Sequence, residues 1–318
     1  MNIVLITPSG PTSRTGNRIA ATRWARILRR LGHRVGLAAD YDGRPADLMV
    51  AVHAWRSAGP IADFKARHPA RPLILQLSGT DIYDYLTSDP RPTLRSMELA
   101  DRLVGLNDLA WRVVPTRLRT RLSVIHQSAT SLPHGNQPSR RAVVVSVIGH
   151  LRDVKDPLRA AKAARLLPAD SRIRVEQVGR AYTATWAAEA TAEMAANPRY
   201  LWCDDVPAAA VRRLLARSHA MVISSLSEGG ANVVSEAIVA GVPVLASRVD
   251  GNVGLLGGDY RGYFPVGDTG KLARLMRRIE CEPAFVATLR QALRQRAPLF
   301  RPAREIAAWR RLLAGLTD

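Results

Sequence analysis

Cysteine and aromatic residues are scarce in this sequence. Its 318 residues include 2 cysteines, and aromatic side chains make up 5%. Cys203 and Cys281 stand far apart and match no metal-ligand spacing, so we expect neither a disulfide framework nor a zinc site, and a reducing compartment is the default. The few aromatic rings leave little surface for base stacking, which disfavours a nucleic-acid partner.

Long apolar runs are also missing. No segment approaches the ~20 apolar residues of a membrane span, and the opening MNIVLIT is too short for the core of a signal peptide. We therefore expect a cytoplasmic protein without stable membrane insertion. The patterns HExxH, GxSxG and GxGxxG are absent as well, so the sequence supports neither a metal site nor a dinucleotide cofactor, and we expect no cofactor.

Positive charge is abundant and almost entirely arginine. The 46 basic residues exceed the 27 acidic ones to give a net charge of +19, and only four of the 46 are lysine. This balance suggests anionic partners such as nucleic acid, a membrane surface or phosphorylated small molecules. The arginines are spread along the chain rather than gathered in runs, which again disfavours nucleic acid. Compositional bias is the alternative explanation of the excess.

Short β-branched runs alternate with amphipathic stretches along the whole chain, which predicts an α/β fold of parallel strands joined by helices. Strands are expected at 2–7, 35–39, 47–52, 72–77, 102–106 and 122–126, and again at 142–148, 173–178, 200–203, 220–224, 242–246 and 262–264. The polar stretch 127–141 between the two series has the composition of a linker. We therefore predict two α/β domains, 1–135 and 136–300, followed by a terminal helix within 301–318.

The segment SSLSEGGANVVSEAIVAGVPVLAS, residues 224–247, carries the most chemical information. Gly229 and Gly230 allow close approach of a ligand and lead into a helix predicted from Ala231, whose free N–H groups favour a phosphate. Glu236 lies on that helix among apolar residues, where a ribose diol would supply two donors. Glu228 stands in the loop, placed to face whatever lies beyond the phosphates. The alternative is a helix start with two satisfied carboxylates.

A second segment, GHLRDVKDPLRA, follows the predicted strand 142–148. His150, Arg152 and Lys155 project from a loop at the carboxyl end of that strand, where open parallel sheets bind ligands. Arg152 and Lys155 would neutralise a diphosphate leaving group. Alternatively, these cations pair with neighbouring aspartates.

A third segment lies at the start of the chain, where the sequence predicts a helix capped by Asn17 and ending at Arg30. Arg14, Arg18 and Arg23 crowd its positive end, which is costly unless an anion binds there. The alternative is a solvated basic helix start.

One further polar turn follows an apolar strand, in the sequence LSGTDIY. Thr80 and Asp81 would lie in the cleft if the two domains face each other. Alternatively, this turn only caps a helix.

Together these features resemble a GT-B glycosyltransferase of the family 4 type. The resemblance rests on two tandem α/β halves, on Glu228 and Glu236 with seven residues between them, and on the loop GHLRDVK. It implies two Rossmann-like domains across a cleft, with a nucleotide-sugar donor on the second. It also implies that Glu236 binds the ribose, Glu228 contacts the sugar and Lys155 binds the diphosphate. The terminal helix is expected to cross back onto the N-terminal domain. Two departures are His150, where the family usually has arginine, and Ser78, where it often has histidine.

The opening TPSGPTSRTGNRIAATRWARILRRLGHRV, with LSGTDIY, SSLSEGGANVVSEAI and GNVGLLGGDYRGYFPVGD, further resembles the selenosugar synthases of selenoneine biosynthesis. That resemblance implies a UDP-sugar donor, expected to be UDP-N-acetylglucosamine, and selenophosphate as acceptor. A selenium anion needs no general base, so Ser78 in place of histidine costs little. The rival readings are a family 4 enzyme with a hydroxyl acceptor and a non-catalytic anion- or nucleic-acid-binding protein of the same fold.

These considerations assign three sets of residues. We expect catalytic roles for Glu228, Lys155 and Arg152, donor binding by Glu236, Gly229, Gly230, Ala231, Asn232 and His150, and acceptor binding by Gly16, Asn17, Arg18, Thr80 and Asp81.

Overall fold

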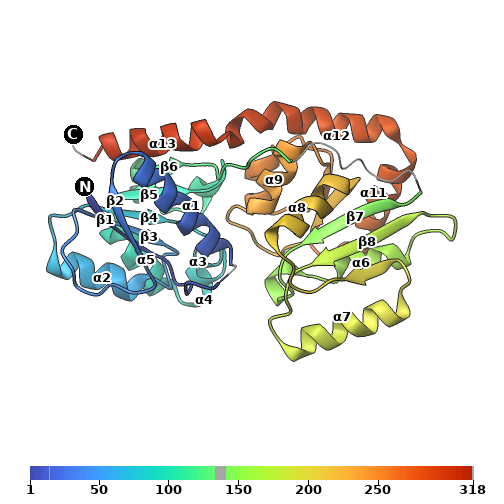
Figure 1. Cartoon of the computed structure of the whole chain (residues 1–318), viewed down its shortest axis with the longest axis horizontal. Coiled ribbons are helices and arrows are strands. Elements are labelled where there is room, and N and C mark those ends of the chain that lie inside the picture. The colour runs from blue at the N-terminus through green and yellow to red at the C-terminus, as the bar shows by residue number, and fades with distance from the viewer. Residues whose placement is uncertain (14, 133–140, 317–318) are drawn as a thin grey trace. The chain divides into compact units, whose positions relative to one another are not determined.

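A computed structural model describes residues 1–13, 15–132 and 141–316 (Figure 1). Contacts divide the chain into two compact units. The first contains residues 1–128, 227–232 and 299–318, and the second contains residues 129–226 and 233–298. The domain boundary predicted at 135/136 lies outside the described residues. Within them, no helix combines the length and apolar character that crossing a membrane requires.

The first unit contains a parallel six-stranded sheet in the order β2-β1-β3-β4-β5-β6. Its strands are β1 Asn2–Ile6, β2 Arg34–Ala38, β3 Leu48–Val52, β4 Leu73–Gln76, β5 Arg102–Gly105 and β6 Leu122–Val124. Every residue of β3 and β4 is buried, as expected of central strands covered on both faces. Strand β1 lies between β2 and β3, so the chain changes direction across the sheet there, and the loops after β1 and β3 diverge at its carboxyl edge.

Helices on both faces of this sheet complete the first unit. They are α1 Gly16–Arg30, α2 Ala58–Arg67, α3 Thr80–Tyr83, α4 Tyr85–Ser88, α5 Pro90–Leu99 and α13 Pro302–Ala314, with the short 3-10 turns η1 Ala110–Arg112 and η2 Thr116–Arg121. Thr15, not Asn17, occupies the N-cap of α1, so the predicted cap is wrong, and Asn17 lies in the first helical turn.

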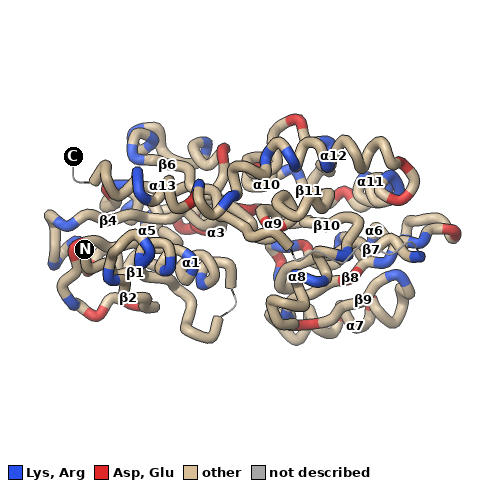
Figure 2. The backbone as a smooth tube through the Cα atoms, turned by 45° about the horizontal axis from the view of Figure 1, so that its top comes forward, with Lys and Arg blue, Asp and Glu red and all other residues tan. Residues whose placement is uncertain are grey.

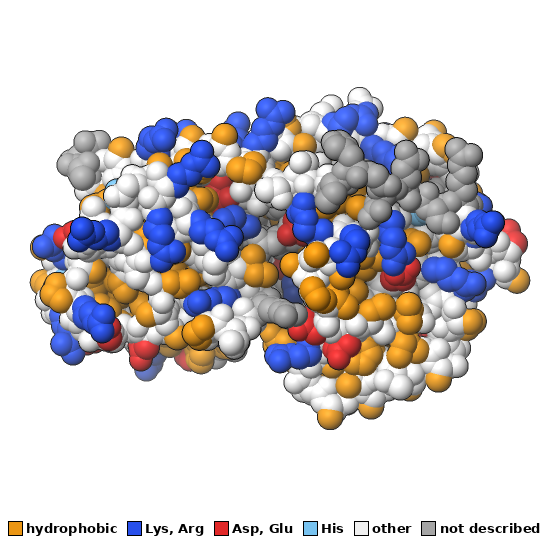
Figure 3. Space-filling model, in the orientation of Figure 1, with side chains coloured by type: hydrophobic (Ala, Val, Ile, Leu, Met, Phe, Trp, Pro, Cys, Tyr) orange, Lys and Arg blue, Asp and Glu red, His pale blue; other side chains and the backbone are white. Residues whose placement is uncertain are grey.

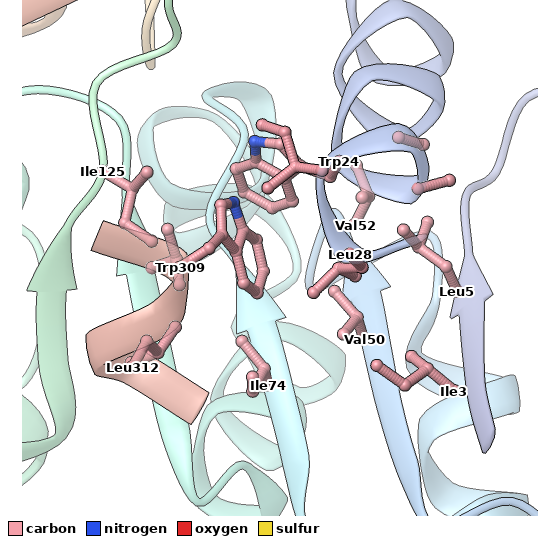
Figure 4. Packing of buried hydrophobic residues seen from close by; sticks show 14 of the residues in the cluster. Ile3, Leu5, Trp24, Leu28, Val50, Val52, Ile74, Ile125, Trp309 and Leu312 are labelled. Atoms are coloured by element: carbon pink, nitrogen blue, oxygen red, sulfur yellow. The ribbon is translucent and has the colours of Figure 1, made fainter. Parts of the chain in front are cut away.

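Two tryptophans join the first and last helices of the first unit. The rings of Trp24 on α1 and Trp309 on α13 meet edge to face with centroids 4.6 Å apart, and both are fully buried (Figure 4). They belong to an apolar cluster that also contains residues of β1, β3 and β4. Helix α13 is therefore part of the core of the unit that begins the chain.

The second unit contains another parallel six-stranded sheet, in the order β12-β11-β10-β7-β8-β9. Its strands are β7 Val143–Ile148, β8 Ile173–Val178, β9 Tyr200–Trp202, β10 Ala220–Ile223, β11 Val244–Ser247 and β12 Tyr263–Phe264. Its helices are α6 Arg159–Arg165, α7 Ala184–Ala196, α8 Ala208–Arg217, α9 Asn232–Ala240, α10 Asp250–Leu256, α11 Thr269–Cys281 and α12 Pro283–Arg296, with the 3-10 turns η3 Asp153–Lys155 and η4 Ala297–Phe300. The latter turn runs into residues that belong to the first unit.

Strand β7 is the point at which the second sheet changes direction, because β8 pairs on one side of it and β10 on the other. Loops that leave the carboxyl ends of β7 and β10 therefore diverge around a crevice, where ligands of open α/β sheets bind. The predicted α/β class and all twelve predicted strands are confirmed.

Candidate functional site

A pocket lies at this direction change in the second unit. Its lining comes mainly from the ends of β7 and β10 and from the loops that follow them: Val147, Ile148, Gly149, His150, Lys155, Pro157, Gln177, Val222, Ile223, Ser224, Ser225 and Val233. Val233 lies in the first turn of α9. The pocket thus combines one lysine, one histidine and a helix start, which are the groups that bind an anion.

Hydrogen bonds hold the two loops of the pocket together. The hydroxyl of Ser224 donates to the carbonyl oxygens of Lys155 at 3.1 Å and Asp156 at 2.9 Å, and the Leu226 amide donates to Val154 O at 2.8 Å. Asp156 adopts a left-handed φ of 43° and pairs with Arg159 at 2.7 Å. These contacts hold the backbone that carries Lys155.

Arg152 lies outside the lining of this pocket. Its guanidinium stacks on the ring of Tyr182 at 5.7 Å, and Arg180 stacks on the same ring at the same distance. The His150 ring lies 5.4 Å from Tyr182, and its Nδ1 accepts a hydrogen bond from the Arg180 amide at 3.2 Å. The structure therefore brings His150 and Lys155 together in the pocket but directs Arg152 to Tyr182, a residue that the sequence reasoning missed.

The loop with Glu228, Gly229 and Gly230 belongs by its contacts to the first unit. A Cβ on Gly229 would lie 1.9 Å from the carbonyl oxygen of Ser78, and one on Gly230 would lie 2.5 Å from the Cβ of Leu106. Glu228 itself is buried, with 8% of its surface exposed. Both glycines are thus required by close packing against protein, in addition to any approach of a ligand.

The side chain of Asp81, a predicted acceptor residue, forms hydrogen bonds with backbone amides in and near its own turn. It is fully buried, and its carboxylate accepts hydrogen bonds from the amides of Ala54, Ser78, Gly79 and Ile82 at 2.6 to 3.1 Å. The carboxylate thus holds the turn in shape through backbone amides, and the role of Asp81 in acceptor binding stays a prediction.

Thr80 contacts a histidine that sequence reasoning missed. The Thr80 hydroxyl lies 2.9 Å from Nε2 of His53, a residue with 1% of its surface exposed and a φ of 75°. His53 Nδ1 accepts the Arg56 amide at 3.2 Å, so the neutral ring carries its proton on Nε2 and donates to Thr80. The only sequence signal was a polar residue directly after a wholly apolar strand.

The start of α1 remains a candidate anion site. Its first turn holds Gly16, Asn17 and Arg18, contains no acidic residue, and has no side-chain cap from Thr15. Arg18 is half-buried and has no ion-pair partner among the described residues, whereas Arg14 lies outside them. Arg23, unlike Arg18, has an ion-pair partner, because Oε1 of Glu305 lies 3.3 Å from its Nε. The expectation that Arg23 needs a bound anion is therefore wrong.

The remaining predicted residues lie around the start of α9. Ala231 directly precedes this helix and Asn232 begins it. Glu236 lies in its second turn and is half-buried beside the buried Ala237. Within the described part of the chain, no cluster of three or more side chains is arranged to hold a metal ion.

Basic residues are spread along the described part of the chain. Figures 2 and 3 show lysine and arginine distributed over elements of both sheets and their helices. This distribution agrees with the scattered arginines of the sequence.

Two doubly wound parallel sheets, with a pocket at the direction change of the second, are the architecture of GT-B proteins. Residues 133–299 match the family described as "Glycosyl transferases group 1", and this match spans more than half of the chain. The chain therefore belongs to that family. No curated protein matches it.

Solved structures with the same fold are distant in sequence. HepE from Anabaena, solved in complex with UDP and glucose, is 15% identical with a TM-score of 0.77, over 100% of this chain and 99% of HepE. Sucrose-phosphate synthase from Thermosynechococcus elongatus is 15% identical with a TM-score of 0.81, over 99% of both chains. TarM from S. aureus is 12% identical with a TM-score of 0.68, over 93% of this chain and 59% of TarM.

Proposed function

We propose that the protein is a selenosugar synthase, which transfers a sugar, expected to be N-acetylglucosamine, from a UDP-sugar to the selenium of selenophosphate. Membership of the glycosyltransferase family supports sugar transfer. The opening segment, the LSGTDIY turn and the SSLSEGGANVVSEAI loop support the particular acceptor.

The donor is assigned to the pocket of the second unit. Lys155 lines this pocket together with the first turn of α9, so a diphosphate would meet a cation and free N–H groups. Glu236 lies one turn further along the same helix, where it would accept the hydroxyls of a ribose. HepE has been solved with UDP-glucose, which supports a uridine nucleotide as the donor.

The observation that carries the acceptor proposal is that the expected acceptor loop has no general base to offer. The Asp81 carboxylate accepts four backbone amides, and both ring nitrogens of His53 have hydrogen-bonding partners. A sugar hydroxyl must lose a proton during transfer, whereas a selenium anion is already a nucleophile. An anionic chalcogen acceptor therefore suits these residues better than a hydroxyl does.

The proposed reaction has two steps, sugar transfer to selenium and hydrolysis of the Se–P bond. A lone pair of selenium forms the bond to the anomeric carbon, and the bond from that carbon to the β-phosphate oxygen breaks, so that UDP leaves with its electron pair. Lys155 and the α9 amides stabilise the negative charge of the leaving diphosphate. Water then attacks phosphorus and breaks the Se–P bond, which releases phosphate and the selenosugar.

The negative charge of selenophosphate also matches the start of α1. Arg18 lacks an ion-pair partner among the described residues, and the first turn of this helix contains no acid. A phosphoryl group placed there would accept hydrogen bonds from the N–H groups of Gly16 and Asn17 and would form an ion pair with the guanidinium of Arg18.

Mass spectrometry of the purified protein with UDP-N-acetylglucosamine and enzymatically generated selenophosphate tests the proposal. We expect a product with the isotope pattern of selenium and UDP release that requires selenophosphate, and we expect Arg18→Ala to weaken both. UDP release with a hydroxyl acceptor and without a selenium product would overturn the proposal and leave the family assignment intact. A reaction without protein is the control for direct chemistry between the substrates.

A further inference from the structure

Glu305 on α13 is a buried carboxylate whose partners come from distant parts of the chain. Its side chain is fully buried, Oε1 accepts a 2.8 Å hydrogen bond from Trp24 Nε1, and Oε2 accepts the Ser128 amide at 2.9 Å and the Ser128 hydroxyl. Nε of Arg23 lies 3.3 Å from Oε1, within ion-pairing distance. These partners hold the carboxylate in one orientation.

Arg23 extends this network away from Glu305. Its Nη2 donates to Oδ1 of Asn232 at 2.8 Å, and its Nη1 donates to the Ser128 carbonyl oxygen at 3.3 Å. A guanidinium is a rigid planar fork, so contacts on one edge determine where the other edge points. Glu305 and Ser128 therefore direct Arg23 toward Asn232.

The contact fixes which way the Asn232 amide faces. Arginine has donors and no acceptor, so Asn232 must present its oxygen to Arg23 and its NH2 group to the opposite side. Nδ2 of Asn232 lies 4.0 Å from where a Cβ on Gly16 would stand, beside the first residue of α1. No described residue accepts a hydrogen bond from this NH2 group.

We infer that Glu305 and Arg23 are positioning residues that turn the NH2 group of Asn232 toward a phosphoryl oxygen bound beside Gly16. The inference rests on the proposed function, in which the first turn of α1 receives a phosphorylated substrate. A phosphoryl oxygen suits the place because the NH2 group of Asn232 lies there beside the start of α1, whose first turn contains no acidic residue. The terminal helix thereby supports substrate binding without touching the substrate.

Arg23→Lys is the main test, with Arg26→Lys as the matched control on an exposed position of the same helix. An ammonium cannot reach Glu305 and Asn232 as a fork, so the Asn232 amide would rotate freely. We expect the KM for selenophosphate to rise about tenfold, or about 1.4 kcal/mol. We expect kcat and the Kd for UDP to change less than about twofold, and the control to match the wild type.

Two further variants separate positioning from folding. Asn232→Asp keeps the contact with Arg23 but presents an oxygen to the anion, so its KM for selenophosphate should rise more than that of Arg23→Lys. Glu305→Gln keeps the shape of the buried side chain and should raise the same KM through Arg23. Because Glu305→Gln alters the core, the midpoint of thermal unfolding is measured for each variant. A raised KM for selenophosphate with an unchanged midpoint in Arg23→Lys and Asn232→Asp supports the inference.

A wild-type KM for selenophosphate and a wild-type Kd for UDP in Arg23→Lys and Asn232→Asp would overturn the inference. If only the Kd for UDP rises in these variants, the inference is supported, and the phosphoryl oxygen beside Gly16 belongs to the donor diphosphate. If the wild-type protein forms no selenosugar, the proposed function fails separately. Inorganic phosphate is then titrated into the UDP-saturated protein, where weaker binding by both variants supports the inference and equal binding overturns it.

Discussion

The side-chain amide of Asn107 donates a 2.7 Å hydrogen bond to the carbonyl oxygen of Gly229. Asn107 is fully buried, and its own oxygen accepts the amide of Leu109 at 2.8 Å, so its orientation is fixed. The loop that carries Glu228 is thus attached to the segment after β5 rather than held only by its neighbours in sequence. In the proposed function, the orientation of Glu228 toward the donor sugar depends on this attachment.

We expect Asn107→Asp to lower kcat by about tenfold or more, because a carboxylate cannot donate to Gly229 and would repel its carbonyl oxygen. Binding of UDP should change little, since Lys155 and the pocket of the second unit are untouched. Steady-state kinetics with calorimetric titration of UDP checks both statements. Unchanged kcat would mean that the loop keeps its place without this bond.

We expect Gly229→Ala to destabilise the protein and to reduce activity, because its Cβ would stand 1.9 Å from the Ser78 carbonyl oxygen. Overpacking of this kind costs about 1–3 kcal/mol. Gly10→Ala is the matched control, since no atom lies within 4 Å of a Cβ there. Thermal unfolding and activity of both variants provide the comparison, and equal behaviour of the two would contradict the close contact.

Lys155→Ala should weaken UDP binding by about 10- to 100-fold, because the diphosphate would lose its charged donor in the pocket. Lys162→Ala removes an exposed lysine from α6 and should leave the affinity unchanged. Calorimetric titration of UDP measures both. Equal affinities in the two variants would place the diphosphate elsewhere.

The lowered pKa of Glu280 leads us to expect that the stability of the protein depends on pH. Burial of its carboxyl raises the pKa, but hydrogen bonds from the Arg172 amide, Ser171 and Arg277 outweigh this and bring the pKa below its ordinary value of 4.5. A lowered folded-state pKa stabilises the protein above pH 4.5, and this contribution is lost as pH falls through the folded-state pKa. Glu280→Gln should therefore cost about 1–2 kcal/mol near neutrality.

The difference between Glu280→Gln and the wild type should narrow below pH 4.5, where the wild-type carboxyl becomes protonated. Urea unfolding at neutral and acidic pH measures the free energy of unfolding of both proteins. A difference that stays constant across this range would show that the lowered pKa does not contribute.

The strands could be predicted from sequence because burial on both faces leaves a local record. Runs such as LMVAV in β3 and AMVI in β10 are continuous apolar segments, and no partner needs to be known to recognise them. The loop glycines after β10 were likewise evident, because the strand, the loop and the helix follow one another in the chain.

Contacts between distant residues could not be predicted in the same way. The partner of Gly229 is Asn107, 122 positions earlier, and no periodicity links the two. Arg23 was interpreted from the charge of its own helix, whereas its carboxylate partner is Glu305 on the last helix. His53 was missed because a single histidine after an apolar strand carries no motif, although the fold buries it against Thr80.

The packing of Trp309 against Trp24 has a consequence for protein synthesis. Residues 1–128 leave the ribosome before the last helix, so during most of translation Trp24 lacks its partner Trp309 and the first sheet lacks one of its covering helices. The unit that is made first is completed last. Loss of the final two turns of α13 would leave a nascent chain with an exposed apolar face and would make it a substrate for chaperones and proteases.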